Sequence, residues 1–189
     1  ELKGHLIRVF NHSRSFIGSL PVGQKVPDAP QALFALSGYS WLKNDFRIWT
    51  LFFDPHIGKY TFRPTGSWKG QSSSTRKIIA YIGDNDAIDE ARKMLVKLLK
   101  EREMLSSGSF NMEPFEVLRD LIRGGRFPSV GGPIQLVKIY QHSNAVPVGV
   151  YWPTKEAQKT TVLGRPLLDF EKCSWGVVDP DNPDRAFPA

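Results

Sequence analysis

The sequence predicts an α+β fold, a single domain in which three to four amphipathic helices pack on one mostly antiparallel sheet of about seven strands. Two kinds of segment support this prediction. Some stretches carry apolar residues at three- and four-residue steps, and others are short aromatic or β-branched runs bounded by Gly, Pro, Asn or Asp. Their order along the chain is helix, three strands, two helices and four strands. Because few helices would connect parallel strands, antiparallel pairing is expected.

The elements of the first third follow from these patterns. The first expected helix covers residues 2–17, where apolar side chains recur on one face. A loop follows, and a short helix is expected over 30–36 because proline suits a first helical turn. The aromatic and β-branched run 46–53 predicts a strand. The alternating segment 59–63 is expected to return beside it as a hairpin.

The rest of the chain continues the mixture of strands and helices. A polar loop is expected to lead into a third strand over 76–82. A turn at 83–86 then supplies N-cap groups for a long helix that ends near Met104. Another helix opens at Glu113 and ends at Gly124. Four further segments bounded by turn residues are expected to be strands: 134–140, 146–152, 160–163 and 174–178.

Length and composition limit the class of protein. The chain has 189 residues, of which 41% are hydrophobic and 23% charged, which excludes a disordered or fibrous protein. One domain is assigned to residues 1–178. The Pro- and Asp-rich residues 179–189 are expected to form a C-terminal extension or a linker. The chain starts at Glu1 with no methionine, and it is expected to be either a trimmed chain or a piece of a larger protein.

Cysteine content and hydropathy predict the cellular setting. The single cysteine, Cys173, excludes an intrachain disulfide and a cysteine-rich zinc site. Because no signal-peptide pattern accompanies it, an intracellular protein is expected, with the cytoplasm as its compartment. No stretch approaches the ~20 apolar residues that cross a membrane, so no membrane partner is expected.

The positive charge is concentrated in one part of the sequence. The formal net charge is +6, from 25 Lys and Arg against 19 Asp and Glu. Residues 31–77, here called the basic segment, hold seven basic residues and two acidic ones, whereas residues 78–120 are net acidic. A local basic excess predicts nucleic acid or another polyanion as a partner. The candidate binding residues are the cations of this segment and one tryptophan: Lys43, Arg47, Lys59, Arg63, Trp68, Lys69, Arg76 and Lys77.

Two stretches of the basic segment suggest how an anion would be held, and each has a simpler alternative. The loop 66–77 offers glycine amides, hydroxyls and cations, the groups that hold phosphate, although its spacing is not that of a Walker A motif. The alternative is that this loop is a solvated connection between two strands. The strand 46–53 places Arg47 and Trp49 on one face, where bases could stack. The alternative is that its aromatic side chains pack under helices.

The sequence contains no motif that defines a reaction. The four histidines lack metal-ligand spacing, so no metal or cofactor is expected. Cys173 lacks a glycine-framed turn, although a pairing with His142 in space stays open. The acidic residues Glu113, Glu116 and Asp120 are expected on a solvated helix face.

Three functional classes follow from these observations. The first is a basic binding module for nucleic acid or another phosphate-bearing partner. The second is a protein-interaction or assembly domain of a larger intracellular protein, with other subunits as partners. The third is a small hydrolase or transferase whose site is not recognisable from motifs, so enzymatic activity stays open.

Overall fold

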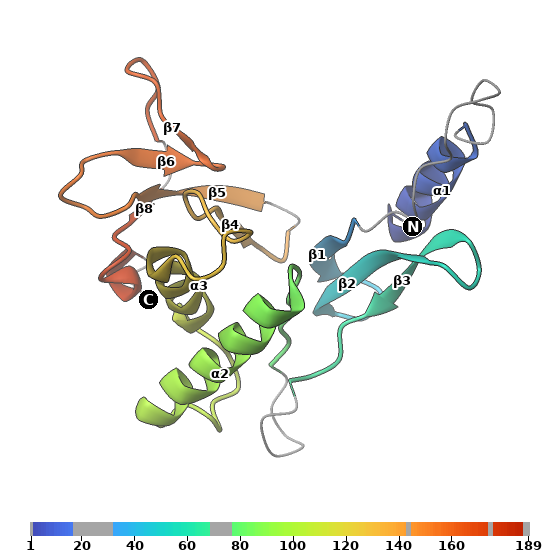
Figure 1. The fold of residues 1–189 in the computed structure, drawn as a ribbon, viewed down its shortest axis with the longest axis horizontal. Helices are drawn as coiled ribbons and strands as arrows, with labels where there is room; N and C mark the ends of the chain where they lie inside the picture. Colours follow the sequence, from blue (N-terminus) through green and yellow to red (C-terminus); the bar gives the residue numbers. More distant parts are fainter. Residues whose placement is uncertain (1, 17–31, 69–76, 143–144, 174–175, 187–189) are drawn as a thin grey trace. The chain divides into compact units, whose positions relative to one another are not determined.

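The computed structural model describes residues 2–16, 32–68, 77–142, 145–173 and 176–186 (Figure 1). Over these ranges the fold is α+β, with three α-helices and eight strands. The strands form two sheets, of three and five strands, in place of the single sheet that was expected. The chain divides into an N-terminal unit, residues 1–66 with 78–82, and a C-terminal unit, residues 67–77 with 83–189. The assignment of residues 1–178 to one domain stays a prediction.

The N-terminal unit consists of a helix and a three-stranded sheet. Its elements are α1 (Leu2–Ser15), β1 (Phe34–Ser40), β2 (Asp45–Asp54) and β3 (Lys59–Pro64). The strands pair antiparallel in the order β1-β2-β3, which confirms the predicted hairpin.

The prediction of a short helix over 30–36 is wrong for the described residues of that range, because residues 34–36 belong to β1. In β1, Phe34 pairs with Leu51 and Leu36 pairs with Trp49. The backbone pairing and the apolar contacts along β2 outweigh the local preference of Pro30 for a helix start.

Strand β2 is the central strand of this sheet and is buried on both faces, at Thr50 and Leu51. Helix α1 covers the face that carries Leu51 and Phe53. Phe10 stacks on Phe34 with ring centroids 4.8 Å apart. Asn11 donates to the backbone oxygen of Tyr60 at 3.1 Å and accepts from its N–H at 2.7 Å. These contacts support the alternative in which the aromatic side chains pack under a helix.

The C-terminal unit combines two helices with a five-stranded sheet. Its elements are α2 (Asn85–Glu101), α3 (Glu113–Gly124), β4 (Leu136–Ile139), β5 (Ala145–Tyr151), β6 (Thr160–Val162), β7 (Arg165–Pro166), β8 (Val177–Val178) and a 3-10 turn, η2 (Pro183–Ala186). The strand order is β4-β5-β6-β7, and all these pairs are antiparallel. Strand β8 pairs with β5 in parallel. Both predicted helices and the strands near β4, β5, β6 and β8 are confirmed.

The prediction of a strand over 76–82 is wrong for the described residues 77–82. These residues contain only an isolated bridge, at Ile78. The two-residue strand β7 was not predicted, since so short a segment carries no detectable alternation.

The core of the C-terminal unit lies between α3 and the sheet. Phe115 of α3 packs with the buried β5 residues Val148 and Val150, together with Val178 of β8. Helix α2 contacts α3, and its buried residues recur at the expected three- and four-residue steps: Ala87, Ala91, Leu95 and Leu99. None of the helices in the described ranges is long and apolar enough to cross a membrane.

Candidate functional site

The predicted binding residues belong to different units. Lys43, Arg47, Lys59 and Arg63 lie in the N-terminal unit, whereas Trp68 and Lys77 lie in the C-terminal unit. Lys69 and Arg76 lie outside the described residues. The basic segment is therefore continuous in the sequence but is divided between two compact units.

A cavity of about 650 Å³ lies in the N-terminal unit, and we call it the basic groove. Its walls come from the first turn of α1, the length of β1 after its start, the β1–β2 turn, the start of β2 and the end of β3. The lining residues are Leu2, Lys3, Leu36, Ser37, Gly38, Tyr39, Ser40, Leu42, Lys43, Arg47, Trp49, Phe62 and Pro64. Three of them are cations and none is a carboxylate.

The cations of the basic groove reach it from three different elements. Lys3 comes from α1, Lys43 from the exposed β1–β2 turn and Arg47 from β2. Arg47 also lies 3.4 Å from the carboxylate of Asp45. The Nε of Arg47 is buried, and no described residue accepts a hydrogen bond from it. Like charges in a hollow with apolar walls concentrate the electrostatic field, so the groove favours an anion.

Aromatic rings line the same hollow. The Nζ of Lys3 lies 4.4 Å from the ring centroid of Phe62 and 5.3 Å from that of Trp49. Tyr39 pairs with Phe46, so its ring lies on the sheet face opposite Trp49 and Phe62, where it contacts Trp41 edge to face with ring centroids 5.1 Å apart. Trp41 is 59% exposed and Leu42, next along the turn, is 91% exposed. Cations and the aromatic rings of Trp49 and Phe62 therefore occur together among the lining residues of the groove.

Two predicted residues of the N-terminal unit do not line the groove. Lys59 is exposed at the start of β3, where it pairs with Asp54. Arg63 lies on the sheet face opposite Phe62, and its guanidinium is 5.2 Å from the ring centroid of Phe52. Of the predicted residues, Lys43 and Arg47 line the groove. Lys3 also lines it and was not predicted. Lys3 is 28 residues before the start of the basic segment in sequence, so only the docking of α1 reveals it.

The predicted residue Lys77 has a buried side chain in the C-terminal unit, where it is 2% exposed. Its Nζ donates a hydrogen bond to the carbonyl of Met104 at 2.8 Å. The same atom lies 5.1 Å from the ring centroid of Phe110 and 5.5 Å from that of Trp68. Rings and a carbonyl together stabilise a desolvated ammonium, so this cation is satisfied within the protein.

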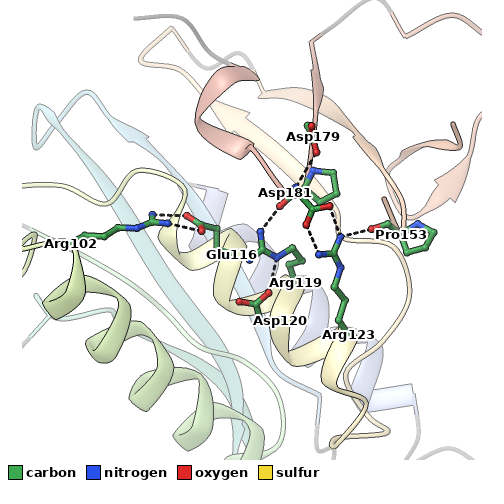
Figure 2. Close-up of polar contacts among 9 residues, drawn as sticks. Arg102, Glu116, Arg119, Asp120, Arg123, Pro153, Asp179 and Asp181 are labelled. Carbon is green, nitrogen blue, oxygen red and sulfur yellow. Dashed lines mark hydrogen bonds and ion pairs between the residues drawn. The ribbon is translucent and has the colours of Figure 1, made fainter. Parts of the chain in front are cut away.

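Helix α3 carries a second group of polar side chains. Glu113 and Glu116 are buried, 1% and 7% exposed, so the prediction of a solvated face is wrong for both. Glu116 accepts two hydrogen bonds from Arg102, at 2.7 and 2.8 Å (Figure 2). This contact raises the pKa of Arg102. Glu113 accepts from the backbone N–H of Asn111 at 2.7 Å. The carboxylates are buried because residues before the helix fold back to satisfy them.

Two arginines of α3 bind the end of the described chain (Figure 2). Arg119 donates to the carbonyl of Pro180 at 2.5 Å. Arg123 donates to both carboxylate oxygens of Asp181, at 2.6 and 3.2 Å, and to the carbonyl of Pro153 at 2.6 Å. Because Pro180 is fully buried, residues 179–181 are part of the packed C-terminal unit.

The contact between Arg123 and Asp181 predicts a dependence of stability on pH. The hydrogen bond from Arg123 lowers the pKa of Asp181. A carboxylate with a lowered pKa stabilises the folded state above its ordinary pKa of ~3.9, and that stability is lost as the pH falls through the lowered value.

We therefore expect Asp181→Asn to lower the melting temperature by about 2–4 °C at pH 7, the effect of ~1 kcal/mol from a half-exposed pair. The difference should become smaller as the pH is lowered from 7 to 2.5, because Asp181 of the parent protein becomes protonated as the pH passes through its lowered pKa. An equal difference at both pH values would contradict the assignment.

The described residues form no group of three or more His, Cys, Asp or Glu side chains that could hold a metal ion. The features with recognisable chemistry are therefore the basic groove, the enclosed ammonium of Lys77 and the ion pairs of α3. Comparison of the sequence with protein-family models and curated proteins, and of the fold with solved structures, finds no match.

Proposed function

We propose that this protein is a basic binding module that holds nucleic acid, or another phosphate-bearing partner, in the basic groove of its N-terminal unit. The observation that carries the proposal is the convergence of Lys3, Lys43 and Arg47 on one hollow, with no carboxylate among the described residues that line it. The cations come from separate elements, so the fold itself brings them together.

The chemistry of these side chains suits phosphate. A lysine ammonium is a compact positive charge on a flexible stem, which can follow a phosphate as it moves. A guanidinium donates several hydrogen bonds in a fixed plane and can bind two oxygens at once. A cavity of about 650 Å³ is within the ~300–1,000 Å³ of ordinary ligand sites.

A second function, protein interaction, is favoured by one observation in the same unit. Trp41 and Leu42 are strongly exposed in the β1–β2 turn, and Phe46 beside them is 45% exposed. Exposed apolar residues that cluster mark interaction sites more often than single ones do. This alternative predicts self-association or binding of another subunit through the turn, and it does not require the cations.

The proposed function predicts binding that weakens with salt and depends on Lys43. We expect the affinity for a labelled 20-nucleotide DNA, measured by fluorescence anisotropy, to fall as salt is raised from 50 to 200 mM. Lys43→Ala should weaken binding and reduce the salt slope by about 1, because one phosphate contact is lost. The stability of the protein should change by less than ~0.5 kcal/mol, since Lys43 is exposed in a turn.

Lys59→Ala is the matched control, because Lys59 is also exposed in the N-terminal unit but does not line the groove. It should leave the affinity and the salt slope nearly unchanged. Equal losses from both variants would place binding on the whole basic segment and overturn the assignment to the groove. No binding at low salt would contradict the proposed function, and light scattering would then test the protein-interaction alternative.

A further inference from the structure

We infer that the phosphate-bearing partner of the basic groove is a phosphorylated segment of another protein, which binds in extended form as an additional strand beside β1. This inference rests on the proposed function and narrows it, because cations alone would hold any phosphate-bearing ligand. The observation that adds to the cations is an open strand edge along the same groove. A strand edge pairs with the backbone of another polypeptide, which nucleic acid does not have.

Strand β1 forms one edge of the three-stranded sheet, whose order is β1-β2-β3. Within the ranges that the structure covers, no strand pairs with β1 on the side away from β2. The sequence of β1 contains no charged residue and no proline, the residues that usually keep another strand off an edge. Ala35 and Ser37 are exposed. Strand β1 is therefore suited to accept a further strand.

The opposite edge of the same sheet is protected. Strand β3 carries Lys59, Arg63 and Pro64, and such charges and a proline disfavour pairing. The side chain of Asn11 also accepts a hydrogen bond from the N–H of Tyr60 at 2.7 Å and donates one to its carbonyl at 3.1 Å. An amide side chain of α1 thus takes the place of a neighbouring strand on β3. The two edges therefore differ, and β1 is the edge left for a partner strand.

The contact between Asn11 and Tyr60 also shows which backbone groups of β1 point outward. Because both backbone groups of Tyr60 bind Asn11, they point away from β2, as do those of every second residue of β3. Pro64, which lacks an N–H, occupies one of these outward positions. The regular register carries the alternation across β2, so the even-numbered residues of β1 bond to β2. The odd-numbered residues, Ala35 and Ser37 among them, direct their N–H and C=O to the open edge.

The basic groove runs along this edge. Its lining contains the five consecutive β1 residues 36–40, although successive side chains of a strand point to opposite faces. The hollow therefore reaches the outer edge of β1 as well as one face of the sheet. Gly38 leaves room at that face, because a Cβ added there would meet no described atom within 4 Å. A strand beside β1 would thus share the hollow with the cations Lys3, Lys43 and Arg47.

A phosphorylated side chain matches these cations. Phosphoserine carries a charge of about −1.5 to −2 at pH 7 and three acceptor oxygens, to which Lys and Arg donate charge-assisted hydrogen bonds. Alternate side chains of an extended segment point to the same face, so a phosphate can enter the hollow while the backbone pairs with Ser37. The cations and the strand edge therefore recognise different parts of one ligand, and each part can be tested separately.

The experiment compares three labelled ligands with the full chain by fluorescence anisotropy. They are a pool of nine-residue peptides with a central phosphoserine and degenerate flanks, the same pool with serine at the centre, and the 20-nucleotide DNA. We expect the phosphorylated pool to bind about tenfold more tightly than the unphosphorylated pool, because charge-assisted hydrogen bonds are added. Lys43→Ala should weaken binding of the phosphorylated pool and of the DNA, since both use the cations.

Two variants of Ser37 separate the backbone from the charge. Ser37→Pro removes an outward N–H without removing a bond to β2, and proline is tolerated at such edge positions. It should weaken binding of the phosphorylated pool about tenfold and change the affinity for DNA less than about twofold. Ser37→Ala keeps the N–H and is the matched control, so its affinity for both ligands should equal that of the parent. Circular dichroism melting checks that both variants fold.

Hydrogen exchange on the parent protein gives a second measurement that needs no variant. Binding of the phosphorylated pool should slow exchange of the outward amides of Ala35 and Ser37 about tenfold, because a partner strand accepts from them. The DNA should leave these two amides nearly unchanged. The amides of Leu36 and Gly38, which are directed to β2, are the internal control and should be slowed less.

The outcomes distinguish this inference from the proposed function. The partner strand is overturned, while the proposed function stands, if the phosphorylated pool binds Ser37→Pro as tightly as Ser37→Ala and leaves the outward amides unprotected. It is also overturned if DNA binds in a Lys43-dependent manner and the phosphorylated pool does not bind. If neither the phosphorylated pool nor the DNA binds at low salt, the proposed function itself fails and the inference fails with it.

Discussion

Replacing Arg102 with alanine is expected to destabilise the C-terminal unit by about 3 kcal/mol. Arg102 gives two hydrogen bonds to Glu116, whose side chain is 9% exposed. Removal of one partner of a buried pair costs ~3–5 kcal/mol, because the other charge is left desolvated without compensation. The lower end applies here because the side chain of Arg102 is 36% exposed and water can partly replace it.

Denaturant unfolding followed by circular dichroism measures this change. The double variant Arg102→Ala with Glu116→Gln should recover part of the loss, because the buried negative charge is removed along with its partner. Arg92→Ala is the matched control on α2, since its ion pair with Asp89 is exposed and contributes ~0–1 kcal/mol. An Arg102 variant as stable as the Arg92 variant would show that Glu116 finds adequate hydration.

Replacing Lys77 with alanine is expected to cost about 3 kcal/mol, whereas Lys77→Met should cost about 1 kcal/mol. The side chain of Lys77 is buried between Trp68, Phe110 and the carbonyl of Met104. Alanine removes the long alkyl stem and leaves a cavity, with a cost in the ~2–5 kcal/mol range of large-to-small core changes. Methionine keeps most of that volume and loses the hydrogen bond to the carbonyl, with a net cost of ~1 kcal/mol.

Thermal melting and anion binding measured on both variants also test the role of Lys77 as a predicted binding residue. If its ammonium only supports the fold, Lys77→Met should bind DNA as the parent protein does. A clear loss of affinity in the stable methionine variant would assign Lys77 to the ligand site. Lys59→Ala, an exposed lysine change, should leave the melting temperature within about 1–2 °C of the parent value.

The sequence predicted well the elements whose signal is local. In α2 the apolar residues recur at helical spacing from Ala87 to Leu99, and the buried face follows that spacing. The hairpin of β2 and β3 follows from a β-branched and aromatic run, a short turn and an alternating return. Helix α3 ends as expected at its glycine pair, where Gly125 has the left-handed φ of 62° that glycine adopts without strain.

The errors arose where distant residues compete with the local pattern. Phe34 and Leu36 became part of a strand because β2 offers backbone partners and apolar neighbours. Glu116 was assigned to a solvated face because helical spacing places it opposite the apolar stripe. Its actual environment depends on Arg102, 14 residues earlier, which no periodicity within α3 can indicate.

The sequence by itself determined the α+β class, the helices and hairpin, and the concentration of cations in the basic segment, because each is a property of neighbouring residues. The tertiary structure alone decided that the strands form two sheets and that the basic segment is divided between two units. It also decided that Lys3, Lys43 and Arg47 share a groove while Lys77 is enclosed. The physical reason is that strand pairing and helix docking depend on contacts between residues far apart in the chain, and these contacts decide which charges face solvent.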